Sequence, residues 1–140
     1  MEDTNITAAT IISFAETLED QSAQFYTELA ALLPRHKDKL LGYAREDKKS
    51  KILIVRTYQE TITDALEACY SFEKLNLQDF AVDEQSAKTL TNAIALEVKA
   101  IRFYNEVAAQ GESLLGTIPR AFRRVAEGRK KRLGELQGLH

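Results

Sequence analysis

One segment of this chain occurs twice, 78 residues apart. The first copy spans residues 18–26 and the second spans residues 96–104; both begin with Leu-Glu and end with Phe-Tyr. Alanines and glutamates around the two copies match at the same offset: Ala15 with Ala93, Glu28 with Glu106, Ala30 with Ala108 and Ala31 with Ala109. An internal repeat constrains the architecture first, because both copies are expected to form the same structural unit.

Each copy carries one glutamate seven residues before a tyrosine: Glu19 precedes Tyr26, and Glu97 precedes Tyr104. Seven residues make about two turns of an α-helix, so the carboxylate and the ring lie on one helical face. The repeat therefore predicts two similar helical hairpins. Each hairpin is expected to open with a helix that directs one carboxylate toward a shared interior.

The composition favours helix throughout the chain. Its 140 residues are enough for a single core of ordinary size, and 44% hydrophobic residues is a globular composition. The chain has only six glycines and two prolines, whereas residues that favour helices are abundant. We expect residues 1–140 to form one all-α domain.

Hydrophobic periodicity and capping residues predict an antiparallel four-helix bundle, with helices over residues 7–33, about 38–72, 84–110 and from about 118. Asn5 or Thr7 is expected to cap the first helix and Asp83 the third. Residues 74–84 break the periodicity and are expected to form the crossover between the two hairpins. Leu77 and Phe80 are its predicted anchors on the bundle.

Each predicted helix carries polar residues midway along its apolar stripe. They are Glu16 and Glu19 in the first helix, Asp47, Ser50 and Lys51 in the second, Glu97 in the third, and Arg129 and Arg132 in the fourth. Charged residues on the seam of a bundle are unusual and need partners. We therefore expect one polar layer across the core.

The repeated Leu-Glu-(five residues)-Phe-Tyr helix resembles the first and third helices of the rubrerythrin branch of the ferritin-like superfamily. In that family, a lone glutamate from each of these helices and a Glu-x-x-His pair from each of the other two hold a di-iron centre. Glu19 and Glu97 match the two lone glutamates. Residues 44–50 and 126–132 match the motifs of the second and fourth helices. The resemblance implies a ferritin-like bundle built from two hairpins.

The metal ligands of the family are incomplete in this sequence. The two Glu-x-x-His positions read Asp47-x-x-Ser50 and Arg129-x-x-Arg132. The only histidines are His36, at a predicted turn, and the last residue. We expect no catalytic residue and no bound metal, and we expect iron only if the altered site still binds a metal. The vestigial site positions are Glu19, Asp47, Ser50, Glu97, Arg129 and Arg132.

Arginine is suited to replace a metal among carboxylates. Carboxylates held close together in a poorly solvated core repel, and one of them would have to stay protonated. Arg129 and Arg132 supply fixed positive charge and planar donor groups that match carboxylates. We therefore predict a buried salt-bridge layer among Glu19, Asp47, Glu97, Arg129 and Arg132.

Two functions remain open from the sequence, and a third ranks below them. The first is a structural, regulatory or partner-binding module without the standard di-iron centre. The second is a rubrerythrin-type oxidoreductase with a non-standard metal site, which would oxidise ferrous iron or react with peroxide or oxygen. The third is an anion-binding module that uses the exposed basic residues of the fourth helix, Arg120, Arg123, Arg124, Lys130 and Lys131.

Charge and cysteine usage bear on partners and location. Residues 1–34 carry six acidic residues and no Lys or Arg, whereas residues 112–140 carry seven basic and three acidic ones, a net +4. We expect neighbouring helices or subunits to complement each other in charge. The single cysteine, Cys69, excludes an intrachain disulfide and a CxxC pair. We expect a cytoplasmic homodimer or a complex with another protein, without membrane or nucleic-acid contact.

Overall fold

The computed structural model describes residues 6–61, 71–72, 75–111 and 117–139. In these ranges the chain forms four α-helices: α1 (Ala8–Leu32), α2 (Lys37–Thr61), α4 (Leu90–Gly111) and α5 (Thr117–Leu139). Two short strands, β1 (Ile6–Thr7) and β2 (Ser71–Phe72), pair antiparallel beside one end of the helices. The predicted all-α class with four helices is confirmed.

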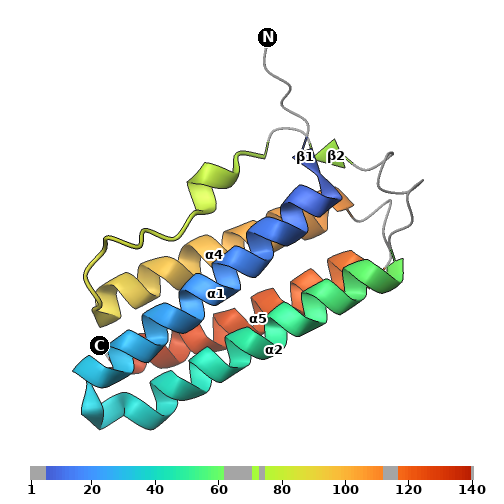
Figure 1. Ribbon diagram of the computed structural model, residues 1–140. Helices are drawn as coiled ribbons and strands as arrows, with labels where there is room; N and C mark the ends of the chain where they lie inside the picture. The colour runs from blue at the N-terminus through green and yellow to red at the C-terminus, as the bar shows by residue number, and fades with distance from the viewer. Residues whose placement is uncertain (1–5, 62–70, 73–74, 112–116, 140) are drawn as a thin grey trace.

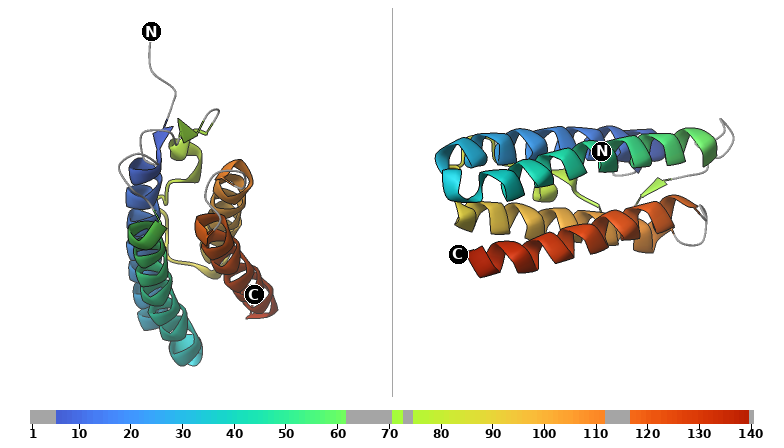
Figure 2. Two further views of the ribbon diagram at one scale, coloured as in Figure 1. Left: turned by 90° about the vertical axis from the view of Figure 1, so that its right-hand side faces the viewer. Right: turned by 90° about the horizontal axis from the view of Figure 1, so that it is seen from below.

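The helices form two layers. Helix α1 packs along α2, and α4 packs along α5. Figure 2 shows these two pairs facing each other, with α2 against α5. The short 3₁₀ turn η1 (Pro34–His36) reverses the chain between α1 and α2. Each layer is thus a pair of antiparallel helices (Figure 1).

A long return segment carries the chain back to the end of the bundle at which α4 begins. The 3₁₀ turn η2 (Leu77–Phe80) and residues 81–89 run beside α4 and lead back to its first turn (Figure 1). Phe80 is buried, and its ring lies 5.8 Å from that of Phe103. Leu77 is partly buried against the same apolar cluster. Both predicted anchors therefore contact the core.

Two predicted helix boundaries were wrong. The second helix does not extend to Phe72, because Ser71 and Phe72 pair with β1; residues 62–70, with Cys69, lie outside the described part of the chain. The third helix begins at Leu90 and not at residue 84. Asp83 caps a turn instead, since its carboxylate accepts a hydrogen bond from the Gln85 amide. The hydroxyl of Thr89 accepts from the Asn92 amide and caps α4.

Apolar side chains fill the bundle in two clusters. One cluster includes Ile11, Leu18, Phe103, Val107 and Phe122. The other includes Leu29, Leu40, Tyr43 and Leu136. The buried charged residues described below fall between these clusters along each helix. None of the described helices is long and apolar enough to cross a lipid bilayer.

Candidate functional site

Five ionisable side chains meet at mid-height of the bundle, and all four helices contribute. Helix α1 supplies Glu19, α2 supplies Asp47, α4 supplies Glu97, and α5 supplies Arg129 and Arg132. Each of these residues is at most 3% exposed. We call these five residues the charged layer.

Helical spacing brings both arginines to the core. Val125, Arg129, Arg132 and Leu136 follow one another at steps of four, three and four residues, and all four are buried. Such steps keep side chains on one face of a helix. The two arginines therefore lie on the same buried face of α5 as the apolar residues on either side of them.

Arg129 lies at the centre of the charged layer. Its Nη1 donates to both carboxylate oxygens of Glu97, at 2.7 and 2.9 Å. Its Nη2 donates to Glu19 at 2.8 Å and to Asp47 at 3.2 Å. One guanidinium thus binds three carboxylates from three helices. The planar guanidinium offers donors from two terminal nitrogens at once, which a lysine ammonium does not.

Arg132 adds a second positive charge at one side of Arg129. Its Nη1 lies 2.8 Å from Asp47 Oδ1 and 3.4 Å from Glu97 Oε2. Its guanidinium also covers the rings of Tyr26 and Tyr43, at 5.2 and 4.9 Å from the ring centroids. These distances are typical of cation–π contacts.

The two tyrosines of the repeat bind the layer reciprocally. The Tyr26 hydroxyl of the first copy donates to Glu97 of the second copy. The Tyr104 hydroxyl of the second copy donates to Glu19 of the first copy. Burial, reinforced by the carboxylate that each ring faces, raises the pKa of both hydroxyls well above its ordinary value. Both tyrosines therefore remain protonated donors.

The charge of the layer is nearly balanced. Two guanidinium groups and three carboxylates sum to −1 when all are ionised. Burial raises the pKa of the Glu19 carboxyl to about 7; Arg129 opposes this shift, and Asp47 adds to it. Burial alone would lower the pKa of Arg129, but Glu19, Glu97 and Asp47 raise it well above the ordinary value. Protonation of Glu19 would make the layer neutral.

The residues of the layer do not fit the di-iron centre that the family resemblance implies. The Arg129 guanidinium fills the space between the three carboxylates, where it makes four hydrogen bonds to their oxygens. No imidazole is among the residues of the charged layer. Among the described residues, no three His, Cys, Asp or Glu side chains come together in an arrangement that holds a metal ion. The only histidine in this part of the chain, His36, lies in η1 at the end of the bundle.

The remaining predicted positions lie outside the layer. Ser50 is half-buried and lines a cavity between α2 and α5. Lys51 pairs with Asp20 at the surface, with 2.9 Å between Nζ and Oδ2. Glu16 is half-buried and is not part of the charged layer.

Sequence reasoning missed two neighbours of the layer. The Ser22 hydroxyl is fully buried and has no protein partner within the described residues. The carbonyl of Tyr43 accepts from Arg132 Nη2 at 3.4 Å, and the Tyr43 hydroxyl donates to Glu135 at 2.7 Å. Ser22 lies three residues after Glu19 on the same helical face, and this spacing could have identified it.

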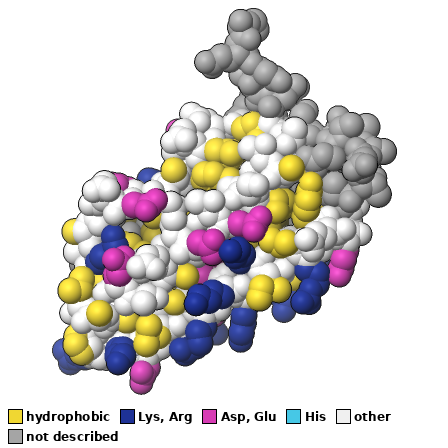
Figure 3. Space-filling model, in the orientation of Figure 1, with side chains coloured by type: hydrophobic (Ala, Val, Ile, Leu, Met, Phe, Trp, Pro, Cys, Tyr) yellow, Lys and Arg dark blue, Asp and Glu magenta, His cyan; other side chains and the backbone are white. Residues whose placement is uncertain are grey.

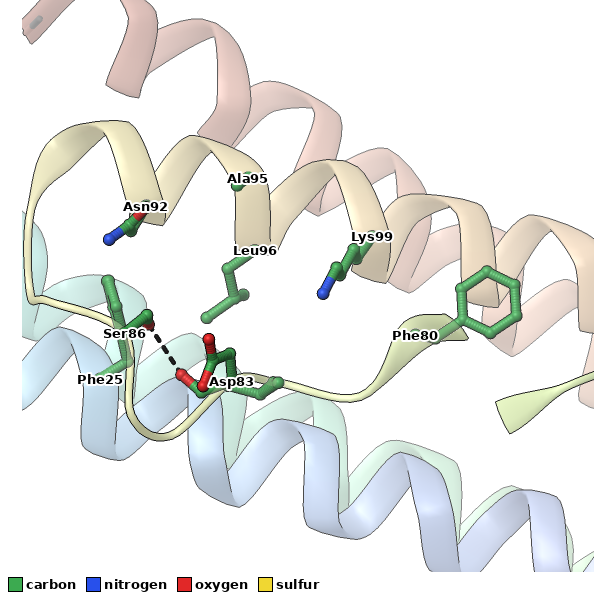
Figure 4. A pocket seen from close by; sticks show the side chains of 9 residues that line it. Phe25, Phe80, Asp83, Ser86, Asn92, Ala95, Leu96 and Lys99 are labelled. Carbon is green, nitrogen blue, oxygen red and sulfur yellow. Dashed lines mark hydrogen bonds between the residues drawn. The ribbon is translucent and has the colours of Figure 1, made fainter. Parts of the chain in front are cut away.

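A separate cavity of about 170 Å³ lies beneath the return segment (Figure 4). Its polar groups hold that segment in place. The Ser86 hydroxyl donates to the Asp83 carbonyl at 2.7 Å. Asn92 Nδ2 donates to the Ala87 carbonyl, and Lys99 Nζ donates to the Ala81 carbonyl. These bonds explain the polar lining as a structural tie between residues 81–89 and α4.

Comparison of the chain with protein-family models, with curated proteins and with solved structures gives no match.

Proposed function

We propose that this chain is a ferritin-like bundle of the rubrerythrin type in which Arg129 takes the place of the metal centre. It acts as a structural, regulatory or partner-binding module and not as an oxidoreductase. The observation that carries the proposal is the buried Arg129 guanidinium, bonded to Glu19, Asp47 and Glu97. Those positions are the ones at which the resemblance places ligands from three helices.

The path of the chain supports the ferritin-like assignment. Ferritin-like bundles combine two hairpins with one long crossover connection. Here α1 pairs with α2, α4 pairs with α5, and the return segment runs beside α4 and leads into its first turn. The reciprocal bonds of Tyr26 and Tyr104 relate the two hairpins as the sequence repeat does.

Metal analysis tests the proposal directly. Protein purified with iron, manganese and zinc available is expected to retain less than one metal ion per chain, because Arg129 and Arg132 already offset most of the negative charge of the carboxylates. Elemental analysis measures the ratio. Two irons per chain, with the absorption band of an oxo bridge, would establish the oxidoreductase instead.

The converse experiment restores the full set of family ligands. A variant with Asp47→Glu, Ser50→His, Arg129→Glu and Arg132→His has four carboxylates and two imidazoles at the matching positions. It is expected to bind two Co²⁺ ions per chain, visible by their absorption spectrum, whereas the unchanged chain does not. A folded variant that binds no metal would show that these positions are not arranged as in the family.

We infer that the module works as a homodimer through the α1–α2 face. A hollow of about 590 Å³ on this face is lined by Glu16, Asp20, Lys48, Lys51, Ile52, Val55, Arg56 and Gln59. Ile52 within it is 57% exposed, which is unusual for a large apolar side chain. Figure 3 shows acidic and basic side chains mixed with apolar ones over α1 and α2. A two-fold interface pairs one patch with its own copy, and a patch that carries charges of both signs can be self-complementary.

The substitution Ile52→Lys is expected to weaken the dimer at least tenfold. It places a charge at the apolar centre of the proposed interface, which costs more than about 1.4 kcal/mol. Sedimentation velocity would give twice the chain mass of 15.8 kDa for the unchanged protein and a shift toward monomer for the variant. Val98→Lys, at another exposed apolar residue on α4, is the matched control and is expected to have no effect. Equal dissociation constants for both variants would contradict this interface.

A further inference from the structure

Charge is divided unevenly between two sides of the bundle. Apart from the charged layer, α2 and α5 contain twelve Lys or Arg and five Asp or Glu, a net +7. On the other side, α1, residues 75–89 and α4 contain three Lys or Arg and seven Asp or Glu, a net −4. The view from below in Figure 2 has α2 and α5 in front of α1 and α4. We call the surface of α2 and α5 the basic side of the bundle, and Figure 3 shows Lys and Arg side chains along the edge that α2 forms.

A groove between α2 and α5 runs along the basic side. Two cavities of about 300 and 460 Å³ form it, and they are continuous because Leu53 and Arg124 line both. Exposed cations from both helices border it: Lys49 from α2, and Arg120 and Arg124 from α5. We call it the α2–α5 groove.

The three exposed cations of the groove are not engaged by the protein itself. Within the described ranges, no ion pair joins Lys49, Arg120 or Arg124 to an acidic side chain, whereas Lys51 pairs with Asp20 elsewhere on α2. The buried arginines of the charged layer also border the groove, but their side chains are enclosed in the core. A ligand in the groove therefore meets the three exposed cations.

The rest of the lining suits phosphate oxygens at the middle of the groove. Along α2, Glu46 comes before Lys49 and Glu60 comes after Leu53, so the two carboxylates lie toward opposite ends. Lys, Arg, Ser and Thr side chains are common donors to the phosphates of nucleic acids. Four hydroxyl groups line the groove beside the cations: Ser50, Thr57, Thr61 and Thr117.

The composition of the groove separates a phosphate backbone from other anionic partners. Protein interfaces rely on aromatic and apolar anchors, and single-stranded bases stack on aromatic rings, but no aromatic residue lines this groove. A lipid surface takes up exposed apolar side chains. Among the described residues, the large exposed ones are Leu32, Ile52 and Val98, and none of them lines the groove. Interfaces with duplex nucleic acid, by contrast, are polar and strongly positive.

We propose that the basic side binds the phosphate backbone of a nucleic-acid duplex, with one strand crossing the middle of the α2–α5 groove. Lys49, Arg120 and Arg124 donate to its phosphates. The acidic side does not prevent this, because two helix layers are about 20 Å thick and charges are screened over about 8 Å at physiological salt. Contacts to the backbone alone carry no sequence preference.

This binding differs from the expectation drawn from the sequence, which was no contact with nucleic acid. The groove forms only when α2 and α5, which are distant in the chain, lie side by side. A duplex gives the proposed partner-binding module its partner, and the binding rests on the proposed function in that respect alone.

A fluorescently labelled DNA duplex of about 20 base pairs is the probe, titrated with the full chain and followed by anisotropy. The dissociation constant is expected in the range of non-specific binding, about 10⁻⁴ to 10⁻⁶ M. Three phosphate contacts give a slope of about −2.7 for the logarithm of affinity against the logarithm of salt. Raising the salt from about 50 to about 200 mM should therefore weaken binding roughly 40-fold.

The double substitution Arg120→Glu with Arg124→Glu is expected to weaken binding at least tenfold and to reduce the salt slope by about two units. Lys49→Glu, on the other helix, should also weaken it if both walls of the groove bind the strand. The matched control is Arg35→Glu with Arg102→Glu, which changes the net charge equally at exposed positions outside the basic side. The control should bind as the unchanged protein does, and circular dichroism verifies that each variant is folded.

Several outcomes would overturn the duplex site. They are the absence of saturable binding at about 50 mM salt, an equal loss in the control, unchanged binding in the double variant, and tighter binding of the single strand. Tighter binding to phosphatidylserine vesicles or to poly-L-glutamate, at equal concentration of charge, would assign the groove to a membrane or to an acidic protein instead. Metal content is measured separately on the same preparation, and two irons per chain would refute the proposed function whatever the duplex result.

Discussion

The substitution Arg129→Ala is expected to lower the free energy of unfolding by about 3–5 kcal/mol, which is the usual cost of removing one member of a buried ion pair. The reason is the charge that stays behind. Without Arg129, the carboxylates of Glu19, Asp47 and Glu97 remain in the core, and Arg132 is then the only buried cation in the described part of the chain. For a chain of this length the melting temperature should fall by roughly 10 °C or more.

Chemical denaturation followed by circular dichroism at pH 7 measures this effect. Arg120→Ala is the matched control, since Arg120 lies on the same helix and is exposed. The control should change the free energy of unfolding by less than about 0.5 kcal/mol. Similar midpoints for the two variants would mean that Arg129 is not the centre of a buried ion-pair network.

The substitution Glu19→Gln is expected to remove a pH dependence of stability. Burial raises the pKa of this carboxyl to about 7 in the folded chain, against 4.5 as its ordinary value. Arg129 and the Tyr104 hydroxyl lower it, and Asp47 raises it; these are the groups that α5, α4 and α2 present to Glu19. Between the two pKa values the folded state binds more protons than the unfolded state, so stability falls as pH rises.

The size of this effect follows from the difference between the two pKa values. The stabilisation is fully present below about pH 4.5 and is lost as the pH rises through about 7. It amounts to roughly 3 kcal/mol. Glutamine is neutral throughout, so Glu19→Gln should gain stability relative to the unchanged chain between pH 5 and pH 8.5.

Urea midpoints measured over that range at constant ionic strength give the comparison. Glu28→Gln, at an exposed position on the same helix, is the control. Its urea midpoints should vary with pH as those of the unchanged chain do. If the urea midpoints of Glu19→Gln vary with pH as those of the unchanged chain do, Glu19 is not the titrating group.

The helices were predictable from the sequence, but some of their ends were not. Apolar spacing reports which residues face a core, and it placed α1 and α5 within a residue or two. The Asp-Glu-Gln-Ser sequence at residues 83–86 looks like a helix start. The bonds from Asn92 and Lys99 to the backbone of residues 81–87 hold it as a turn. Such contacts between distant residues leave no local signal.

The sequence predicted which residues belong to the charged layer, but not which atoms of these residues bind each other. All five members follow from helical periodicity, and Glu19 and Glu97 follow from the repeat as well. Which oxygen each guanidinium binds depends on the rotation and height of one hairpin relative to the other, and no local pattern encodes these. The reciprocal tyrosine bonds are an exception, because a repeat with one such bond implies the other.

Ser50 shows the limit of the motif comparison. The family pattern places it beside Asp47 as a ligand position, but it lines a cavity between α2 and α5 and is only half-buried. The side chains of arginine reach the layer from α5, so a short side chain on α2 has no role there. The motif identifies the position, and the size of the neighbouring side chains decides its contacts.

The distribution of charge over the two hairpins also determines which halves of the chain can associate. The α1–α2 hairpin brings Glu19 and Asp47 to the layer and no cation, whereas the α4–α5 hairpin brings Glu97 with two arginines. Two copies of the first hairpin would bury four carboxylates without a counter-charge. Two copies of the second would bury four guanidinium groups with two carboxylates. Although the halves share a repeated helix, only the unlike pair approaches neutrality, so the charged layer discriminates against self-pairing of either half.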